Sequence, residues 1–500
     1  MTETLLLSPR EIRVVVIGAM ICLFLAALDQ TIVATALPTI SGDLGDVHLM
    51  SWIVTAYLLT STAATPILGK MSDLHGRRPI MRVCIVVFLI GSVLCALSGS
   101  MMTLILSRAL QGFGGGGLIT LAQTAVADVV APRERGKYGA YFAGVWAGSA
   151  LLGPVLGGEL TAHANWHWIF WINLPIGIIA LIIVDPILKR LTGRKTKHKI
   201  DYASIALFFC SSTAFLLAVS SGGSFLPWLS PAVIGAVVIS VITAVFFYRR
   251  QRVLTEPIIP LHFFHNTVVT PVLLAIFLVF GAYLALAIMT PTYLQLVFSA
   301  SADEVGRLII PFMLSSTVGA ALSGRFITRT GTYKLPPLLG MPVAIICLII
   351  LGLIAQTATK PELIVLLTLV GLGIGPIFPI ANVAAQNAVD RRDLGAVSGA
   401  ISFARALGGA VSTAAASNVV LSLAVAAFAS SSSAGDLTEV MRAPLTEAEH
   451  AGFAHAYAVF FFAVAAWLTV GLYAFARVEA RPLRSRAEME TAAKAAMMEP

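Results

Sequence analysis

Apolar residues run along this chain in long stretches that short polar segments interrupt. Each stretch is about 20 residues long, the length that a helix needs to cross the hydrocarbon core of a bilayer. Strands of a membrane barrel alternate apolar and polar residues, whereas these stretches are apolar on every face, so the pattern predicts helices. We expect fourteen spans, at residues 14–35, 50–69, 80–99, 102–123, 138–160, 167–187, 202–221, 231–248, 268–290, 305–325, 336–355, 362–384, 395–421 and 453–476.

Basic residues indicate which loops face the cytoplasm, because cytoplasmic loops of membrane proteins are enriched in Lys and Arg. If the N-terminus is cytoplasmic, these spans place all but five of the 33 Lys and Arg residues in cytoplasmic loops and tails. The exceptions are Arg307, Lys360 and Arg442 in external loops, and Arg108 and Arg405 inside spans. An even number of spans then puts both termini in the cytoplasm.

The composition agrees with a membrane protein and excludes other classes. Hydrophobic residues make up 58% of the 500 residues and charged residues 12%, with a mean hydropathy of +0.89. The net charge of +8 would suggest nucleic-acid binding in a soluble protein, but here it follows from the loops, so we expect no nucleic-acid partner. No nucleotide-binding or hydrolase motif occurs, so we expect no cofactor. The cysteines all fall in apolar runs and are interpreted as core residues, without disulfides or a metal site: Cys22, Cys84, Cys95, Cys210 and Cys347.

Short segments repeat along the chain and indicate a duplicated fold. Glycines seven residues apart follow the second and tenth spans, and an Arg-x-x-Gly segment precedes the fifth and thirteenth: Gly69 and Gly76, Gly324 and Gly331, residues 133–136 and residues 392–395. Transporters with such repeats bind substrate near the bilayer midplane, between the halves. We therefore expect an all-α polytopic membrane protein with two six-helix bundles, residues 1–190 and 263–500. Residues 191–262 supply two inserted transmembrane helices and their basic cytoplasmic linkers.

Asp29 is the one acidic residue in the middle of a predicted span. A carboxylate is costly to bury in a membrane, so an acid at this depth is a functional candidate by default. Asp29 could exchange a proton against a cationic substrate. The alternative is that its hydrogen bonds only fix the first span in the bundle.

Two arginines also lie inside spans, where a guanidinium keeps its charge and needs a partner or water. Arg108 could hold a carboxylate or relay protons with Asp29, or it could stabilise the bundle through backbone hydrogen bonds. Arg405 lies in the thirteenth span, and no acid lies in the middle of spans nine to fourteen. Its partner is therefore not evident from the sequence, and Glu159 is one candidate.

A tight loop after the second span carries Asp73, Arg77 and Arg78, and Gly69 and Gly76 permit its sharp turn. These charges could pair with neighbouring helix ends and latch one conformation. The alternative is that the arginines only anchor the loop in the cytoplasm, which leaves Asp73 without a purpose.

The fifth span is rich in glycine and has a proline in its middle. Small residues at helical spacing let helices approach closely, and proline bends a helix. A close-packed, bendable seam between the two halves is expected at Gly148, Gly153, Pro154, Gly157 and Gly158.

Polar and aromatic residues within the spans are candidates for the wall of a substrate cavity, and the alternative for each is ordinary packing. His163 and His167 could bind zinc, but their neighbouring tryptophans favour an aromatic belt at the membrane surface. The cavity candidates are Tyr57, Gln111, Gln123, Tyr283, Phe378, Asn382, Gln386 and Arg405.

In combination, these segments resemble a known family. Residues 69–78 resemble the signature loop of the major facilitator superfamily. Residues 28–38, 108–114 and 148–158 are similar to the first-span, proton-linked and antiporter motifs of its fourteen-span drug:proton antiporter branch. Residues 166–175 and 256–261 also look typical of this branch.

The resemblance implies a proton-coupled antiporter, not an enzyme, that exports lipophilic or cationic small molecules by alternating access. Such multidrug efflux leads to antibiotic resistance. It further implies that Asp29 is the proton and cation site, Arg108 its relay partner, and Asp73 with Arg77 the latch. A monomer surrounded by lipid in the bacterial cytoplasmic (inner) membrane is expected. The lack of further acids in the later spans favours monovalent or neutral substrates over divalent cations. The alternative is a dedicated transporter of a specific lipid, siderophore or metabolite.

Overall fold

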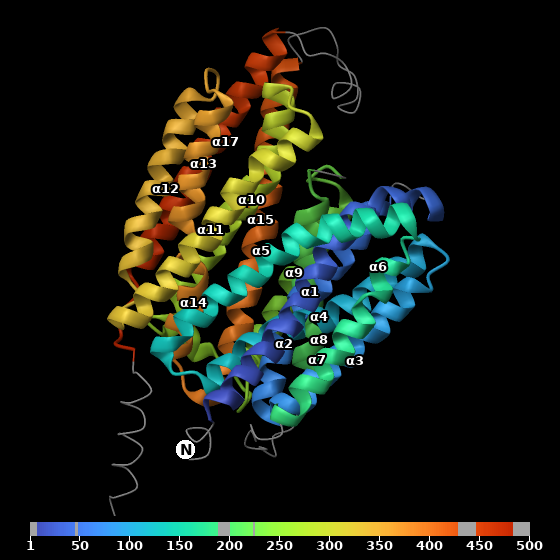
Figure 1. Cartoon of the computed structure of the whole chain (residues 1–500), viewed down its shortest axis with the longest axis vertical. Helices are drawn as coiled ribbons and strands as arrows, with labels where there is room; N and C mark the ends of the chain where they lie inside the picture. Colours follow the sequence, from blue (N-terminus) through green and yellow to red (C-terminus); the bar gives the residue numbers. More distant parts are fainter. Residues whose placement is uncertain (1–7, 46–48, 189–200, 224–225, 429–446, 484–500) are drawn as a thin grey trace, which may run out of the picture.

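Figure 1 shows the computed structural model, which describes residues 8–45, 49–188, 201–223, 226–428 and 447–483. Apart from an isolated β-bridge between Gly222 and Leu226, the regular elements in these ranges are helices. The N-terminal half consists of α1 (Pro9–Leu44), α2 (Met50–His75), α3 (Arg77–Ala96), α4 (Met101–Val129), α5 (Pro132–His163), α6 (Trp168–Trp171) and α7 (Asn173–Leu188).

Two helices, α8 (Tyr202–Ser221) and α9 (Pro231–Gln251), follow this half, and a short 3₁₀ helix, η3 (Leu261–His265), leads into the second half. The C-terminal half consists of α10 (Val269–Phe298), α11 (Ala302–Thr330), α12 (Leu335–Ile354), α13 (Lys360–Ile374), α14 (Ile377–Asn387), η4 (Arg391–Asp393), α15 (Leu394–Phe428) and α17 (Glu447–Ala476). The predicted boundary at residues 190–191 lies outside the described residues, and the boundary at 262–263 falls within η3.

Local sequence signals explain where several helices begin. At α1 the hydroxyl of Ser8 accepts the N–H of Glu11 at 3.3 Å, while the carboxylate of Glu11 accepts the N–H of Ser8 at 2.7 Å. The hydroxyl of Ser100 caps α4 in the same way, with Thr103 as its partner. These caps satisfy donors that the first turn of a helix leaves free.

Thirteen spans among the described residues are long and apolar enough to cross a membrane. The remaining predicted span is α4, which has 29 residues but carries Arg108, Gln111 and a run of four glycines that lower its hydropathy. Together they match the fourteen expected spans, and the expected all-α polytopic fold is confirmed. The predicted span 362–384 is divided into α13 and α14 at Gly375 and Pro376, because proline has no N–H for the helix ladder.

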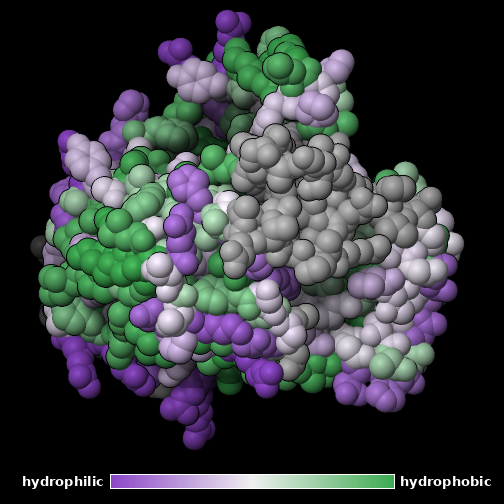
Figure 2. Space-filling model, turned by 90° about the horizontal axis from the view of Figure 1, so that it is seen from above, coloured by the Kyte–Doolittle hydropathy of each residue, from purple (hydrophilic) through white to green (hydrophobic). Residues whose placement is uncertain are grey.

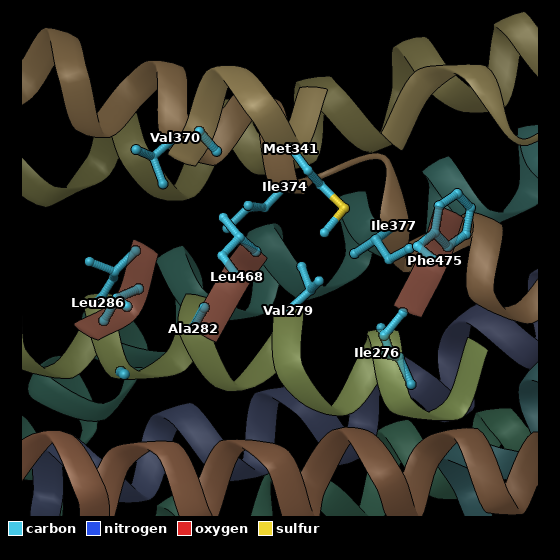
Figure 3. Close-up of a cluster of buried hydrophobic side chains, with 14 of the residues drawn as sticks. Ile276, Val279, Ala282, Leu286, Met341, Val370, Ile374, Ile377, Leu468 and Phe475 are labelled. Atoms are coloured by element: carbon cyan, nitrogen blue, oxygen red, sulfur yellow. The ribbon is translucent and has the colours of Figure 1, made fainter. Parts of the chain in front are cut away.

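The two halves form separate bundles with separate cores (Figure 1). In the N-terminal half α4 packs on α1, α2 and α3, and α1 packs on α5 and α7. In the C-terminal half α10 packs on α15 and α17, and α12 packs on α13 and α17. Figure 3 shows the second core, where Val279 on α10, Met341 on α12, Ile374 on α13 and Leu468 on α17 meet.

The inserted helices α8 and α9 pack on each other, and α8 also contacts α2 and α15. Arg250 on α9 donates to Asp201, next to the start of α8, with Nε to Oδ2 at 2.6 Å and Nη2 to Oδ1 at 2.8 Å. These hydrogen bonds lower the pKa of Asp201 to about 2. This pair lies at the end of the molecule where α1 begins and α2 ends, which we call the basic end.

The outer faces of the helices are apolar, as a surface in contact with lipid requires. Leu106 on α4, Ile182 on α7 and Leu353 on α12 are among the large exposed side chains. Figure 2, seen from above, shows apolar residues gathered in broad patches on the side of the molecule. Cys210 on α8 is also exposed, so its interpretation as a core residue was wrong, whereas the other four cysteines are buried.

Candidate functional site

Asp29 lies at the centre of a polar cluster buried inside the N-terminal half. Its side chain has no exposed surface, and its Oδ2 accepts a hydrogen bond from Nη1 of Arg108 at 2.5 Å. Its Oδ1 accepts from Nε2 of Gln111 and from Nδ2 of Asn173, each at 2.8 Å. An ionised carboxylate can only accept hydrogen bonds, so three converging donors match the ionised form.

Arg108 has further contacts that fix its guanidinium. Its Nη1 also donates to Oε1 of Gln111 at 2.6 Å, and its Nε donates to the carbonyl oxygen of Ile53 at 3.4 Å. The centre of the guanidinium lies 4.3 Å from the centre of the Tyr57 ring, which is a cation–π distance. The sequence predicted Asp29 and Arg108 as possible partners and Tyr57 and Gln111 as cavity candidates, and the structure brings all four together.

Two residues of this cluster, Ser92 and Asn173, were not singled out from the sequence. The hydroxyl of Ser92 on α3 accepts from Gln111 at 2.7 Å and from Asn173 at 2.8 Å. Asn173 belongs to a segment that resembles the family, and it stands at the start of α7. For Ser92 the sequence holds no signal, because a membrane serine usually bonds its own helix.

Glycines bring the helices of this site into close contact. A Cβ at Gly91 of α3 would lie 2.6 Å from Cα of Gln111, and one at Gly112 of α4 would lie 2.4 Å from the carbonyl oxygen of Tyr57. A Cβ at Gly115 would lie 2.2 Å from the Tyr57 hydroxyl. These positions tolerate no larger residue, so the glycines of α4 set the distance between Arg108 and the neighbouring helices.

The glycine-rich stretch of α5 is only partly packed, and its packed positions contact α1 of the same half, so the expected seam between the halves is not found there. A Cβ at Gly153 or Gly157 would lie 2.2 Å from the hydroxyl of Thr31 or Thr35 of α1, respectively. By contrast, Gly148 and Gly158 have no atom within 4 Å of such a Cβ, and Pro154 is exposed. The expectation of close packing is therefore wrong for Gly148, Pro154 and Gly158, which lie on a different face of the helix.

The junction of α2 and α3 joins the two halves at the basic end; the residues expected on a loop lie on helices, with Asp73 in the last turn of α2 and Arg77 at the start of α3. Asp73 pairs with Arg77 at 2.5 Å, and its carboxylate accepts the backbone N–H groups of Gly395 at 2.9 Å and Ala396 at 2.8 Å. The first turn of α15 has unpaired N–H groups and a positive dipole end, so an acid stabilises it. Arg77 also binds Asp128 of α4 at 2.7 Å.

Arg78 does not take part in this contact between the halves. It pairs with Asp185 of α7 at 2.8 Å, and Arg82 pairs with the same carboxylate. Arg78 therefore ties α3 to α7 within one half. Gly76, with φ of 92°, makes the turn that separates Asp73 from Arg78 in space.

The repeated glycines pair crosswise between the halves. A Cβ at Gly69 of α2 would lie 2.3 Å from the carbonyl oxygen of Gly395 of α15. One at Gly324 of α11 would lie 2.2 Å from the carbonyl oxygen of Gly136 of α5. Arg133 adds hydrogen bonds to the last carbonyls of α11, at Thr328 (3.0 Å) and Arg329 (2.6 Å).

Of the other cavity candidates, three occupy packing positions and two belong to an aromatic group near Arg405. Gln123 and Gln386 are buried, and Gln386 donates to Ser398 at 3.0 Å. Asn382 donates to the carbonyl of Phe378 at 3.3 Å. Tyr283 and Phe378 are partly buried in an aromatic group near Arg405.

At the end of α5, Glu159 is not the partner of Arg405, and His163 and His167 each have another neighbour instead of forming a zinc site. Glu159 lies 3.1 Å from His163 on its own helix, and both side chains are mostly exposed. His167 stacks on Trp166 at 3.7 Å between ring centres, which agrees with an aromatic belt.

Two six-helix bundles, an inserted helix pair and a buried ion pair define a polytopic membrane transporter fold. The family model of the Major Facilitator Superfamily matches residues 19–413, and the chain belongs to this superfamily of membrane transporters of small molecules.

Among its relatives, the multidrug transporter protein MdtP of Bacillus subtilis (strain 168) is 34% identical over 395 residues, 78% of this chain and 72% of that protein. Efflux pump dotC of Dothistroma septosporum (strain NZE10 / CBS 128990) is 36% identical over 406 residues, 80% of this chain and 70% of that protein. Among solved structures, the human organic anion transporter MFSD10 has the same fold, with a TM-score of 0.65 at 16% identity over 94% of this chain and all of that one.

Proposed function

We propose that this protein is a proton-coupled secondary active exporter of lipophilic small molecules, cations among them. It would work by alternating access in the bacterial cytoplasmic membrane, with the basic end and both termini in the cytoplasm. The observation that carries the proposal is the buried pair of Asp29 and Arg108 inside a superfamily fold. The multidrug transporters and efflux pumps among the relatives support export as the direction.

Asp29 is the group that would take the proton. In its ionised form it accepts from Arg108 and Gln111 of α4 and from Asn173 of α7, so its bonds join α1 to two other helices. A proton on Oδ2 would point at the N–H of Arg108 Nη1, and two donors cannot share one hydrogen bond, so Arg108 would have to move away. The charge of Arg108 would then be unbalanced in a dry site, which favours a rearrangement of α1, α4 and α7.

Alternating access needs two arrangements of the halves, and the contacts at the basic end would stabilise one of them. The halves touch through Gly69 with Gly395 and Gly136 with Gly324, and Asp73 holds the start of α15. In this arrangement the cytoplasmic side would be closed. Opening it would require Asp73 to release the backbone of Gly395 and Ala396.

The test is transport in liposomes that contain the purified protein under an imposed pH gradient. We expect gradient-driven movement of a fluorescent lipophilic cation by the wild type and none by Asp29→Asn. Asp201→Asn is the matched control, because the same exchange is made at an acid outside the buried cluster, and it should transport normally.

Normal gradient-driven transport by Asp29→Asn would contradict the role of this residue in coupling. If the wild type moves none of several unrelated lipophilic compounds, multidrug export is wrong. The better hypothesis is then a dedicated carrier of a lipid, siderophore or metabolite.

A further inference from the structure

The C-terminal half contains a charged side chain that the coupling site does not use. Arg405 lies on the face of α15 that packs on α10, one turn before Gly408 and two turns before Ser412. A Cβ at Gly408 would lie 2.0 Å from the carbonyl oxygen of Phe277, and one at Gly281 would lie 2.1 Å from Oγ of Ser412. Arg405 therefore points toward the bundle and not toward lipid.

The charge of Arg405 is not balanced within the part of the chain that the structure describes. No carboxylate pairs with it there, and no oxygen accepts a hydrogen bond from it. The group that faces its charge among the described residues is the ring of Phe280, whose centre lies 5.5 Å from the guanidinium carbon. By sequence, each Asp and Glu in the helices of this half lies in a first turn, such as Glu304 and Glu362. A ring face replaces only part of the solvation that a guanidinium loses in a membrane.

The Phe280 ring that faces this cation belongs to a group of three aromatic side chains. The ring centre of Phe280 lies 6.0 Å from that of Tyr283 and 5.9 Å from that of Phe378. Tyr283 and Phe378 are 5.5 Å apart. All three rings and Arg405 are partly buried, so each keeps some accessible surface. The three rings come from α10 and α14 and form one apolar wall beside a permanent positive charge.

This wall lies beyond the contacts that join the halves at the basic end. On α15 a Cβ at Gly399 would lie 2.7 Å from the carbonyl oxygen of Thr65, and Arg405 follows six residues later. At 1.5 Å per residue it is about 9 Å further from the basic end. Arg405 therefore lies on the side of the seam that faces away from the basic end, where a molecule from that side would meet it first.

We propose that Arg405, together with the rings of Phe280, Tyr283 and Phe378, binds the carboxylate end of an otherwise aromatic, apolar substrate. The inference rests on the proposed export function and names one part of its substrate class. A carboxylate fits because it can accept two parallel hydrogen bonds from a guanidinium. Arg108 cannot serve in this way, because Asp29 already occupies it.

The test is equilibrium binding of a radiolabelled naphthoate and of its uncharged amide to the purified protein. Hydrogen bonds to charged groups predict a roughly tenfold or greater preference of the wild type for the carboxylate. In Arg405→Gln the preference should vanish while binding of the amide stays unchanged. Arg405→Lys should keep part of the preference, because it keeps the charge without the planar fork. Arg249→Gln, the same exchange at an exposed end of α9, should behave as the wild type.

Three results would overturn the proposal: no preference for the carboxylate in the wild type, no binding of either compound, or a preference that persists in Arg405→Gln. If Arg405→Gln does not fold, the wild type and Arg405→Lys decide the matter. Failure of this inference is separable from failure of the export proposal. Gradient-driven transport of a lipophilic cation without carboxylate preference would refute only the anion site. Carboxylate preference without any gradient-driven transport would refute only export.

Discussion

The two halves each bury an arginine within the membrane-spanning region, and they treat it in opposite ways. Arg108 has a carboxylate, an amide oxygen, a backbone carbonyl and a tyrosine ring around it. Arg405 has one phenylalanine ring among the described residues. The difference follows largely from where acids occur, since Asp29 in the N-terminal half is the one acid in the middle of a predicted span.

The comparison teaches that related bundles can divide the work of a transporter. A fully bonded arginine would suit the proposed proton site, because a change in the charge of its partner would affect several helices. An arginine with only a ring beside it remains free to accept a partner from outside. Substitutions at Arg108 and Arg405 should therefore change the folding stability by different amounts and in opposite directions.

Arg108→Gln is expected to have the largest effect. It leaves the Asp29 carboxylate charged, buried and without its ion-pair partner, which costs about 3–5 kcal/mol of folding stability. Gradient-driven transport should be lost as well. Unfolding curves of the purified protein measure the first effect, and the double variant with Asp29→Asn should recover part of the stability. A double variant as unstable as Arg108→Gln alone would show that the two side chains are not energetically coupled.

Asn173→Ala should have the next largest effect. Asp29 and Ser92 lose a shared donor in a buried place, which costs roughly 1–3 kcal/mol. Transport should slow while the helices remain packed. Asn165→Ala, in the exposed turn before α6, is the matched control for the same measurements. Equal stability of the two variants would remove Asn173 from the Asp29 cluster.

Arg405→Gln should act in the opposite direction on stability. It removes a charge that no described carboxylate balances, so we expect a gain of about 1 kcal/mol. The same unfolding curves test the sign. A loss comparable to that of Arg108→Gln would mean that Arg405 has an equivalent partner and that the two halves do not differ.

Tyr57→Phe should have the smallest effect. The ring that faces Arg108 is kept, and the hydroxyl has only a long hydrogen bond to the carbonyl of Ala26 at 3.5 Å and an interaction with the side chain of Gln30, so the change should cost about 0.5 kcal/mol. Tyr57→Leu removes the ring and should cost about 1–2 kcal/mol through the lost cation–π contact. Equal effects of both variants on stability would assign the contribution of Tyr57 to its hydroxyl.

The helical fold and its span positions could be predicted because hydropathy and loop charge both report on the membrane directly. The pairing of Asp29 with Arg108 could be proposed because each is too costly to bury alone. The roles of Ser92 and Asn173 could not, since the packing of α3, α4 and α7 at Gly91 decides which hydroxyl and amide converge.

The division of the α5 glycines between two faces was also hidden in the sequence. Helical spacing places Gly153 and Gly157 on one face, but it does not show that this face meets α1. In the same way, Arg77 and Arg78 are neighbours in sequence yet bind Asp128 and Asp185 on different helices. Tertiary contacts, which adjacent residues need not share, determined these partners.

The crosswise glycine contacts, Gly69 with Gly395 and Gly136 with Gly324, bring backbone against backbone with no side chain between them. Interlocked long side chains would have to adopt one rotamer on closing and regain their freedom on opening, and each would carry an entropic cost. A seam of bare peptide groups has no rotamers to order. If the halves separate as proposed, these two glycine contacts would form and break at little rotamer cost, whereas Asp73 and Arg133, whose side chains bond across the same seam, would have to release their partners.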